Sequence, residues 1–243
     1  MTTLLADGHS EFYALGEGYA GRLYLIIIPQ SFPITLSKGN VLHQLRFFRG
    51  RRRFLDREEL EAIHCETPLV TNTDPVFTDN GIMLHLDLTN GPPPLVSHRM
   101  GKSIELGKIG YLDPDLFFRA KPKDEYGNLF LEPYDFMLAP TKEVIEVPPH
   151  LCAEIEPHNE KHGELRIHLA GLVNPGFKAF VVCEFRNIGQ IPQILTDGRA
   201  IGAIRFERLT GIPDALYGTE SAEKRPNSYQ QQTSLLPKMF RAT

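Results

Sequence analysis

Cysteine, excess positive charge and long apolar runs are all scarce in this sequence of 243 residues. Its three cysteines are widely spaced and odd in number, which argues against a disulfide framework and favours a reducing compartment such as the cytoplasm. The formal net charge of -4 leaves no basic excess with which to bind a nucleic-acid backbone. No apolar run approaches the roughly 18 residues of a membrane span, and residues 1–10 do not resemble a signal peptide. We therefore expect a cytoplasmic protein with neither nucleic acid nor membrane as its partner.

Short apolar segments between turns predict a mostly β fold of the barrel or sandwich type. The composition is that of a globular chain, and its 19 prolines and 20 glycines indicate many turns. Residues 22–28 combine β-branched and aromatic side chains, which predicts a strand buried on both faces. Other strands are predicted at 41–48, 82–88, 144–147, 151–155, 165–169, 180–186 and 200–207.

One helix is predicted, beginning after Asp56. Asp56 and Glu59 form a capping-box pattern ahead of apolar residues, and the helix is expected to end near His64. Residues 66–80 are rich in Thr, Pro, Asp and Asn without periodicity, which predicts a linker or surface loop between two units.

An internal repeat relates the two units, because residues 32–47 align without gaps on residues 191–206. The second copy is preceded by a long stretch of its own unit, whereas the first copy has almost none before it. We therefore expect three parts: the end of a truncated first unit at 1–55, a helix and linker at 56–78, and a complete second unit at 79–243. The matching positions are Pro33, Leu36, Gly39, Arg46 and Phe47 with Pro192, Leu195, Gly198, Arg205 and Phe206.

Three further motifs favour structural interpretations. The G-x-G-x-x-G pattern at 16–21 precedes a strand rather than a helix, which indicates a glycine turn. The His-x-Glu triplets at 9–11, 158–160 and 162–164 form half of the zinc-deaminase signature, but the P-C-x-x-C half is absent, so we predict no metal site. The basic residues Arg49 and 51–53 predict a solvated charged face.

Glu184 is the leading candidate for a functional residue. It lies in the otherwise apolar segment 180–185, where an ionised carboxylate costs free energy unless it has a partner. Burial would raise its pKa toward neutrality, as a group that both takes and gives a proton requires. The alternative is a structural carboxylate paired with Arg186 or Arg205, and the residues alone leave both interpretations open.

Three segments of the sequence resemble dCTP deaminases, a family that shares the trimeric dUTPase fold. Residues 131–151 resemble the family's P-G-x-F-x-L-x-x-T-x-E-x-I-x-x-P-x-x-L segment, and residues 168–187 resemble its A-x-x-x-D-P-G-F-x-G-x-x-x-L-E-x-x-N core. Tyr217 and residues 229–232 resemble a C-terminal segment that closes over the nucleotide. The resemblance implies a dUTPase-like β-barrel or jelly-roll (β-clip) unit, preceded by a truncated copy of the same unit and the short helix.

The same resemblance implies hydrolytic deamination of dCTP to dUTP by a homotrimer, since the family's sites are built between subunits. Glu184 takes the place of the catalytic glutamate, no zinc takes part, and Mg²⁺ is carried by the triphosphate. Asn174 would contact the sugar 3'-hydroxyl, Phe177 would wall the sugar and base, and the tail would close over the phosphates as a mobile lid. The residues implied to bind the nucleotide are His158, Lys161, Ala170, Asn174, Phe177, Val182, Tyr217, Lys224, Tyr229 and Gln232.

The chain departs from the family pattern at the phosphate-binding segment Ser-Ser-x-x-x-Arg. Pro157 and His158 replace the serines, and Lys161, a point charge rather than a bidentate fork, replaces the arginine. Ser228 replaces the usual lysine before the tail tyrosine, which leaves Lys224 or Arg225 as its substitute. Leu25 or Ile26 takes the place of the glutamate in the first unit, which we therefore expect to be structural. Two alternatives stay open: a non-catalytic nucleotide-binding or regulatory protein, and a deaminase that also hydrolyses dUTP to dUMP.

Overall fold

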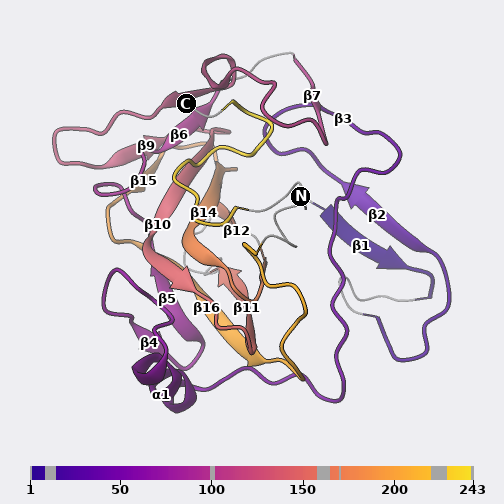
Figure 1. Ribbon diagram of the computed structural model, residues 1–243. Coiled ribbons are helices and arrows are strands. Elements are labelled where there is room, and N and C mark those ends of the chain that lie inside the picture. The colour runs from indigo at the N-terminus through magenta and orange to yellow at the C-terminus, as the bar shows by residue number, and fades with distance from the viewer. Residues whose placement is uncertain are drawn as a thin grey trace.

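Two five-stranded antiparallel sheets form the centre of the computed structural model (Figure 1). The structure describes residues 2–8, 15–98, 102–157, 165–169, 171–219 and 229–241, with the side chains of residues 157 and 169 excepted. The first sheet has the order β12-β14-β10-β6-β8, and the second has the order β13-β11-β16-β5-β4. The first sheet consists of β6 (Leu95–Ser97), β8 (Phe118–Ala120), β10 (Phe136–Glu146), β12 (Leu165–Leu169) and β14 (Lys178–Asn187). The second consists of β4 (Phe77–Thr78), β5 (Gly81–His85), β11 (Leu151–Pro157), β13 (Leu172–Val173) and β16 (Ala200–Arg208).

Shorter elements surround the two sheets. The helices are α1 (Arg57–Glu66) and the 3-10 helix η1 (Pro114–Leu116). Of the helices that the structure describes, none is long and apolar enough to cross a membrane. The paired strands are β1 (Thr2–Ala6) with β2 (Leu23–Ile27), β3 (Ile34–Thr35) with β7 (Ile104–Glu105), and β9 (Leu129–Leu131) with β15 (Gln193–Leu195).

The first sheet is covered on both faces, because alternate residues of a strand point to opposite sides. Met137 and Ala139 of β10 lie in the main core, between the two sheets. Phe136 and Leu138 of the same strand lie in a second core on the outer face, where Phe117 is fully buried. This second core is an aromatic cluster that contains segments from both ends of the chain.

The helix prediction is confirmed. Asp56 accepts a hydrogen bond from the backbone N–H of Glu59 at 3.0 Å, and the Glu59 side chain accepts one from the backbone N–H of Asp56 at 3.2 Å. These reciprocal bonds satisfy N–H groups that have no partner within the helix. The helix continues to Glu66, two residues past the expected end at His64.

The segment 66–80, predicted as a linker or surface loop, contributes to the core. Leu69 and Val70 are 0% and 3% exposed and belong to the main core, and Val70 forms a bridge to Ile145 on β10. The segment ends in β4. The division of the chain at 56–78 stays a prediction.

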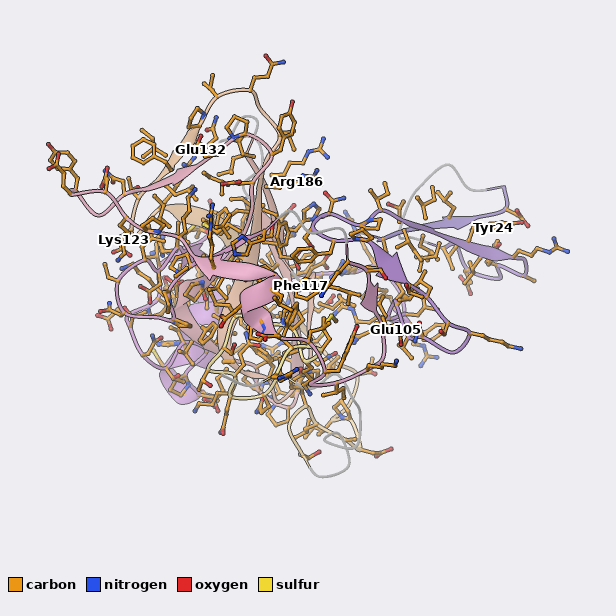
Figure 2. The ribbon with its side chains drawn as sticks, turned by 90° about the horizontal axis from the view of Figure 1, so that it is seen from above. Tyr24, Glu105, Phe117, Lys123, Glu132 and Arg186 are labelled. Carbon is orange, nitrogen blue, oxygen red and sulfur yellow. The ribbon has the colours of Figure 1, made fainter. Side chains whose placement is uncertain are left out.

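The hairpin β1–β2 extends away from the two sheets, and Figure 2 shows Tyr24 on it, far from Phe117 in the centre. A strand was predicted here and is found, but its predicted burial is wrong. Leu23, Tyr24 and Ile26 are all exposed large apolar residues. In a two-stranded sheet no second layer covers the apolar side chains, so the sequence pattern and the burial disagree.

The repeat is preserved at its turn and lost in its following strand. Gly39 and Gly198 occupy equivalent positions and have φ values of +94° and +73°. Both turns are closed by a backbone hydrogen bond: the Asn40 N–H donates to the Ser37 carbonyl at 3.1 Å, and the Arg199 N–H donates to the Thr196 carbonyl at 3.3 Å. Residues 200–208 form β16, but residues 41–48 form no strand, so that prediction is wrong. Phe47 is 94% exposed, whereas its equivalent Phe206 is 0% exposed.

The predicted strands of the second unit are all found. Their observed counterparts are β5, β10, β11, β12, β14 and β16, and β10 is much longer than the predicted 144–147. The mostly β fold class is confirmed. The short strands β6, β7, β8, β9, β13 and β15 were not predicted, since segments of two or three residues carry no clear alternation.

Candidate active site

β14 presents Glu184 on the outer face of the first sheet. Val181, Cys183 and Phe185 point into the main core, whereas Val182 and Glu184 point the other way. Val182 packs against the second core, and Glu184 is exposed to solvent. The expected burial of Glu184 is therefore only partial, since the residue keeps exposed surface while the protein desolvates its carboxyl group.

Glu184 has one closed side and one open side. The antiparallel register pairs it with Leu138 on β10 and with His168 on β12. Leu138 is 3% exposed and part of the second core, which closes the β10 side. β12 is the outermost strand of the sheet among the described residues, so the second side is covered by His168 alone, and Glu184 keeps exposed surface there. A ligand can reach the carboxyl group from that side.

Neither arginine considered as a structural partner pairs with Glu184. Arg186 donates through Nη1 to the backbone carbonyl of Gln30 at 3.0 Å and to its side-chain oxygen at 2.8 Å. Arg205 lies on β16 in the other sheet and pairs with Glu156 at 2.7 Å. Within the described part of the chain, the Glu184 carboxyl group has neither a hydrogen bond nor an ion pair. The structural alternative is therefore wrong for both arginines.

Burial raises the pKa of Glu184 above its ordinary value. The residue keeps exposed surface, yet the surrounding protein removes part of the hydration of its carboxyl group, and this outweighs the opposing effect of the positively charged N-terminal amine. Such a group holds its proton more tightly than a fully hydrated glutamate. It is therefore suited to exchange a proton with a ligand near neutral pH.

The C-terminal tail, residues 229–241, crosses the same face of the first sheet. The backbone N–H of Gln231 donates to the carbonyl of Lys178 at 3.0 Å, and the Gln232 amide donates to the carbonyl of Phe180 at 3.4 Å. Leu235 and Phe240 belong to the second core. The tail is thus held at both of its ends, beside β14 and inside the aromatic cluster.

Tyr229 connects the tail to Glu184. Burial is the main cause that raises the pKa of the Tyr229 hydroxyl, and the nearby Tyr217 and Glu184 raise it further. The backbone N–H of Tyr229 donates to the Tyr217 hydroxyl. The three side chains therefore lie within electrostatic reach of one another.

A tight turn at residues 174–177 holds a second group of predicted residues. Gly176 has a φ of +87°, and a Cβ at this position would lie 2.9 Å from the backbone oxygen of Tyr217, so only glycine fits. The rings of Phe177 and Tyr217 are 5.6 Å apart between centroids, and the Asn174 carbonyl accepts the Phe177 N–H at 3.1 Å. Glu184 lies six residues beyond the start of β14, about 20 Å along the strand at about 3.3 Å per residue.

Comparison with known protein families matches nearly the whole chain. The model of the 2'-deoxycytidine 5'-triphosphate deaminase (DCD) C-terminal domain matches residues 56–240, and the N-terminal domain model of the same family matches residues 1–51. The chain belongs to the 2'-deoxycytidine 5'-triphosphate deaminase family.

Individual members of this deaminase family match parts of the chain. A protein of Halobacterium salinarum named "dCTP deaminase, dUMP-forming" is 38% identical over 155 residues, which are 58% of this chain and 75% of that protein. A "dCTP deaminase" of Natronomonas pharaonis is 35% identical over 113 residues, 45% of this chain and 55% of that protein. The crystal structure of 2'-deoxycytidine 5'-triphosphate deaminase from Agrobacterium tumefaciens superposes on this structure with a TM-score of 0.75 and 28% sequence identity. The match covers 90% of this chain and 66% of that chain.

The structure places the described deaminase residues in two groups, one around Glu184 on β14 and one at the turn of residues 174–177, about 20 Å along the strand from Glu184. Val182 and Glu184 share one face of β14, Tyr229 lies near both Glu184 and Tyr217, and Tyr217 contacts Phe177. Four predicted ligands of the nucleotide lie outside the described residues, as do the three His-x-Glu triplets. These four are His158, Lys161, Ala170 and Lys224.

Two residues near the site were missed by the sequence analysis. Gln230 ties the tail to the glycine turn, since its side chain accepts the Lys178 N–H at 2.9 Å and donates to the Gly176 carbonyl at 2.9 Å. His168 faces Glu184 across the strand pair. The predicted alternation of residues 165–169 already placed His168 opposite the apolar residues, but only the strand register assigns Glu184 as its partner.

The basic run at residues 51–53 lines a separate cavity of about 520 Å³, together with Phe54 and Arg205. The predicted solvated face is confirmed, since these arginines are exposed, although Arg52 also pairs with Glu207 at 2.9 Å and Arg53 with Glu59 at 2.7 Å. Because these cations are already neutralised by carboxylates, the cavity offers little free positive charge. In the described ranges no three His, Cys, Asp or Glu side chains come together as metal ligands.

Proposed function

We propose that this chain hydrolyses dCTP to dUTP and ammonia. The observation that carries the proposal is Glu184, a carboxyl group with a raised pKa that pairs with neither Arg186 nor Arg205, on the outer face of β14 with the tail tyrosine near it. Membership of the deaminase family supports the substrate class. The names of its relatives support the reaction type.

Glu184 serves first as a base and then as an acid. Its carboxylate takes a proton from water while the water oxygen forms a bond to C4 of the cytosine ring, and the carboxyl group passes that proton to N3. The second proton of the former water is then moved to the exocyclic nitrogen, the C4–N4 bond breaks, and ammonia leaves. A pKa raised toward the working pH suits both steps, because the same group must accept and release a proton.

Other residues hold the nucleotide in this proposal. Asn174 contacts the sugar 3'-hydroxyl and Phe177 walls the sugar and base, while the tail closes over the phosphates. The triphosphate brings its own Mg²⁺, and no zinc takes part. Tyr217, Tyr229 and Gln232 meet the phosphates, and His158, Lys161, Ala170, Val182 and Lys224 complete the nucleotide contacts.

We also propose a homotrimer in the cytoplasm, with no membrane or nucleic acid as partner. The exposed edge beside β12, next to Glu184, is a place where a second copy can complete the site. Cys65, Cys152 and Cys183 are all free, as expected in a reducing compartment.

A second candidate is a bifunctional enzyme that converts dCTP to dUMP. It is favoured by the name of the Halobacterium salinarum relative, which specifies dUMP formation. Such an enzyme would also hydrolyse the bond between the α- and β-phosphates. That second step depends on how the tail and the phosphate-binding residues hold the triphosphate.

Incubation of the purified protein with dCTP and Mg²⁺, followed by chromatographic separation of the products, distinguishes these functions. Formation of dUTP supports the deaminase, and formation of dUMP without free dUTP supports the bifunctional enzyme. Binding of dCTP without any turnover would show instead a non-catalytic nucleotide-binding protein.

Glu184→Gln tests the mechanism. This substitution keeps the size of the side chain but removes proton transfer, so we expect turnover to fall by about 10²- to 10⁴-fold or more. Glu125→Gln, on an exposed turn, is the matched control and should keep full turnover. An active Glu184→Gln protein would rule out the acid–base role.

A further inference from the structure

His168 shares the outer face of the first sheet with Glu184. On β12, Leu165 and Ile167 are buried in the main core, so Arg166 and His168 point to the opposite side. His168 is half-buried and is the direct cross-strand partner of Glu184. It therefore borders the open side of the carboxyl group, by which a ligand has to enter.

The two side chains are close enough for their polar groups to contact the same small molecule. Directly paired residues on neighbouring antiparallel strands have Cβ atoms about 4.5–5.5 Å apart. No hydrogen bond joins His168 to Glu184 among the interactions of the described residues. Two polar groups that face each other without a direct bond are commonly bridged by water. The reaction proposed above requires a water molecule beside Glu184.

The surroundings favour an uncharged imidazole. Burial lowers the pKa of His168, and the positive charges of the N-terminal amine, Arg166 and Arg186 lower it further. The N-terminal amine also acts on the Glu184 carboxyl group. The other titratable groups on this face are Tyr229 and Lys238 of the tail, since Lys238 Nζ lies 5.4 Å from the Tyr229 ring centroid. A neutral imidazole both donates and accepts one hydrogen bond, whereas an imidazolium only donates.

We propose that His168 orients the attacking water, which lies between its neutral imidazole and the Glu184 carboxylate. The inference rests on the proposed deaminase function and adds a second residue to it. The imidazole accepts one hydrogen bond from the water, or donates one to it, and so directs the water oxygen toward C4. Protonation of His168 removes the acceptor and places a cation beside Glu184, which weakens that carboxylate as a base.

The pH dependence of turnover separates this role from a structural one. Protonation of Glu184 and protonation of His168 should each abolish activity. A plot of log kcat/KM against pH for the parent should therefore fall toward acid pH, first with a slope of one and then with a slope that approaches two. His168→Gln retains hydrogen bonding without titrating, and its slope should stay at one. His168→Leu should lose about 10- to 100-fold in kcat, because the water is no longer oriented.

His150→Leu is the matched control, because His150 is exposed on the turn before β11 and should leave turnover unchanged. Parental kcat and slope in His168→Leu would overturn the proposal. So would a slope that is the same in the parent and in His168→Gln.

An NMR titration tests the pairing without any turnover. The His168 ring should titrate below the ordinary histidine value, and Glu184→Gln should move its midpoint, because the two groups share one water. An unchanged midpoint in Glu184→Gln would refute the pairing. Failure of the parent to deaminate dCTP would instead refute the proposed function, so the two failures are distinguishable.

Discussion

At the scale of the residue, the environment decides what a glutamate can do. Burial would raise the pKa of Glu207, but the hydrogen bond from Arg52 and the charges of Arg46 and Arg52 outweigh it, so that its pKa is lowered. Desolvation of Glu184 is opposed only by the charge of the N-terminal amine and prevails, so that its pKa is raised. The first carboxylate is committed to an ion-pair cluster that stabilises the fold. The second is left free to exchange a proton with a ligand.

The raised pKa of Glu184 predicts a pH-dependent change in stability. The folded state holds this proton more tightly than the unfolded chain, so the stabilisation is complete below the ordinary pKa of 4.5 and is lost as the pH rises through the folded-state pKa. Glu184→Gln does not titrate. We therefore expect its melting temperature to exceed that of the parent at pH 8, with a smaller difference at pH 4, as measured by calorimetry. A constant difference at both pH values would contradict the shift, and Glu125→Gln serves as the control.

At the scale of the element, the glycine turn sets where the site residues lie. Gly176 adopts a left-handed backbone conformation against Tyr217, which lets Phe177 and Tyr217 meet before β14 begins. Gln230 of the tail then bonds both the turn and the start of β14. Turn, strand and tail are therefore mutually dependent.

Gly176→Ala should destabilise the protein by more than about 1 kcal/mol, because alanine is strained at positive φ and its Cβ would lie 2.9 Å from the Tyr217 oxygen. Gly198→Ala is the matched control, since it has a positive φ but its nearest neighbour, Lys142 Cε, lies 3.8 Å away. Urea unfolding of both variants measures the difference. Equal losses would show that backbone strain alone, and not the contact with Tyr217, accounts for the effect.

At the scale of the whole molecule, the two repeats use the same residues differently. Phe206 on β16 lies between the two sheets, paired with Ala153 on β11. The equivalent Phe47 belongs to a segment without strand structure and is 94% exposed. The same side chain thus contributes to stability in one copy and hardly at all in the other.

Phe206→Ala and Phe47→Ala form a matched pair that measures this difference. Removal of the buried ring should cost about 3–5 kcal/mol, whereas removal of the exposed one should stay within about 0.5 kcal/mol. Denaturant unfolding of both variants checks the prediction. A loss at Phe47 similar to that at Phe206 would mean that Phe47 is buried in solution, for example against another copy.

Local interactions made much of the fold predictable. Capping by Asp56 and Glu59 and the alternation from Ile82 to Leu88 involve residues close together in the sequence. Each was correctly predicted, because local geometry alone imposes it. Where the outcome depended on a covering layer, as for residues 22–28 and 41–48, the same patterns led to a wrong burial or a wrong strand.

The sequence by itself determined the mostly β class, the helix and the choice of Glu184 as the functional candidate, since each follows from neighbours in the chain or from the chemistry of one side chain. Only the tertiary structure decided that Arg186 and Arg205 pair elsewhere than with Glu184, that His168 faces it, and that Phe47 is exposed while Phe206 is buried. These facts depend on which strands pair and in which register. Strand pairing and register are determined by distant segments that bury apolar surface together. They cannot be read from any short stretch of sequence.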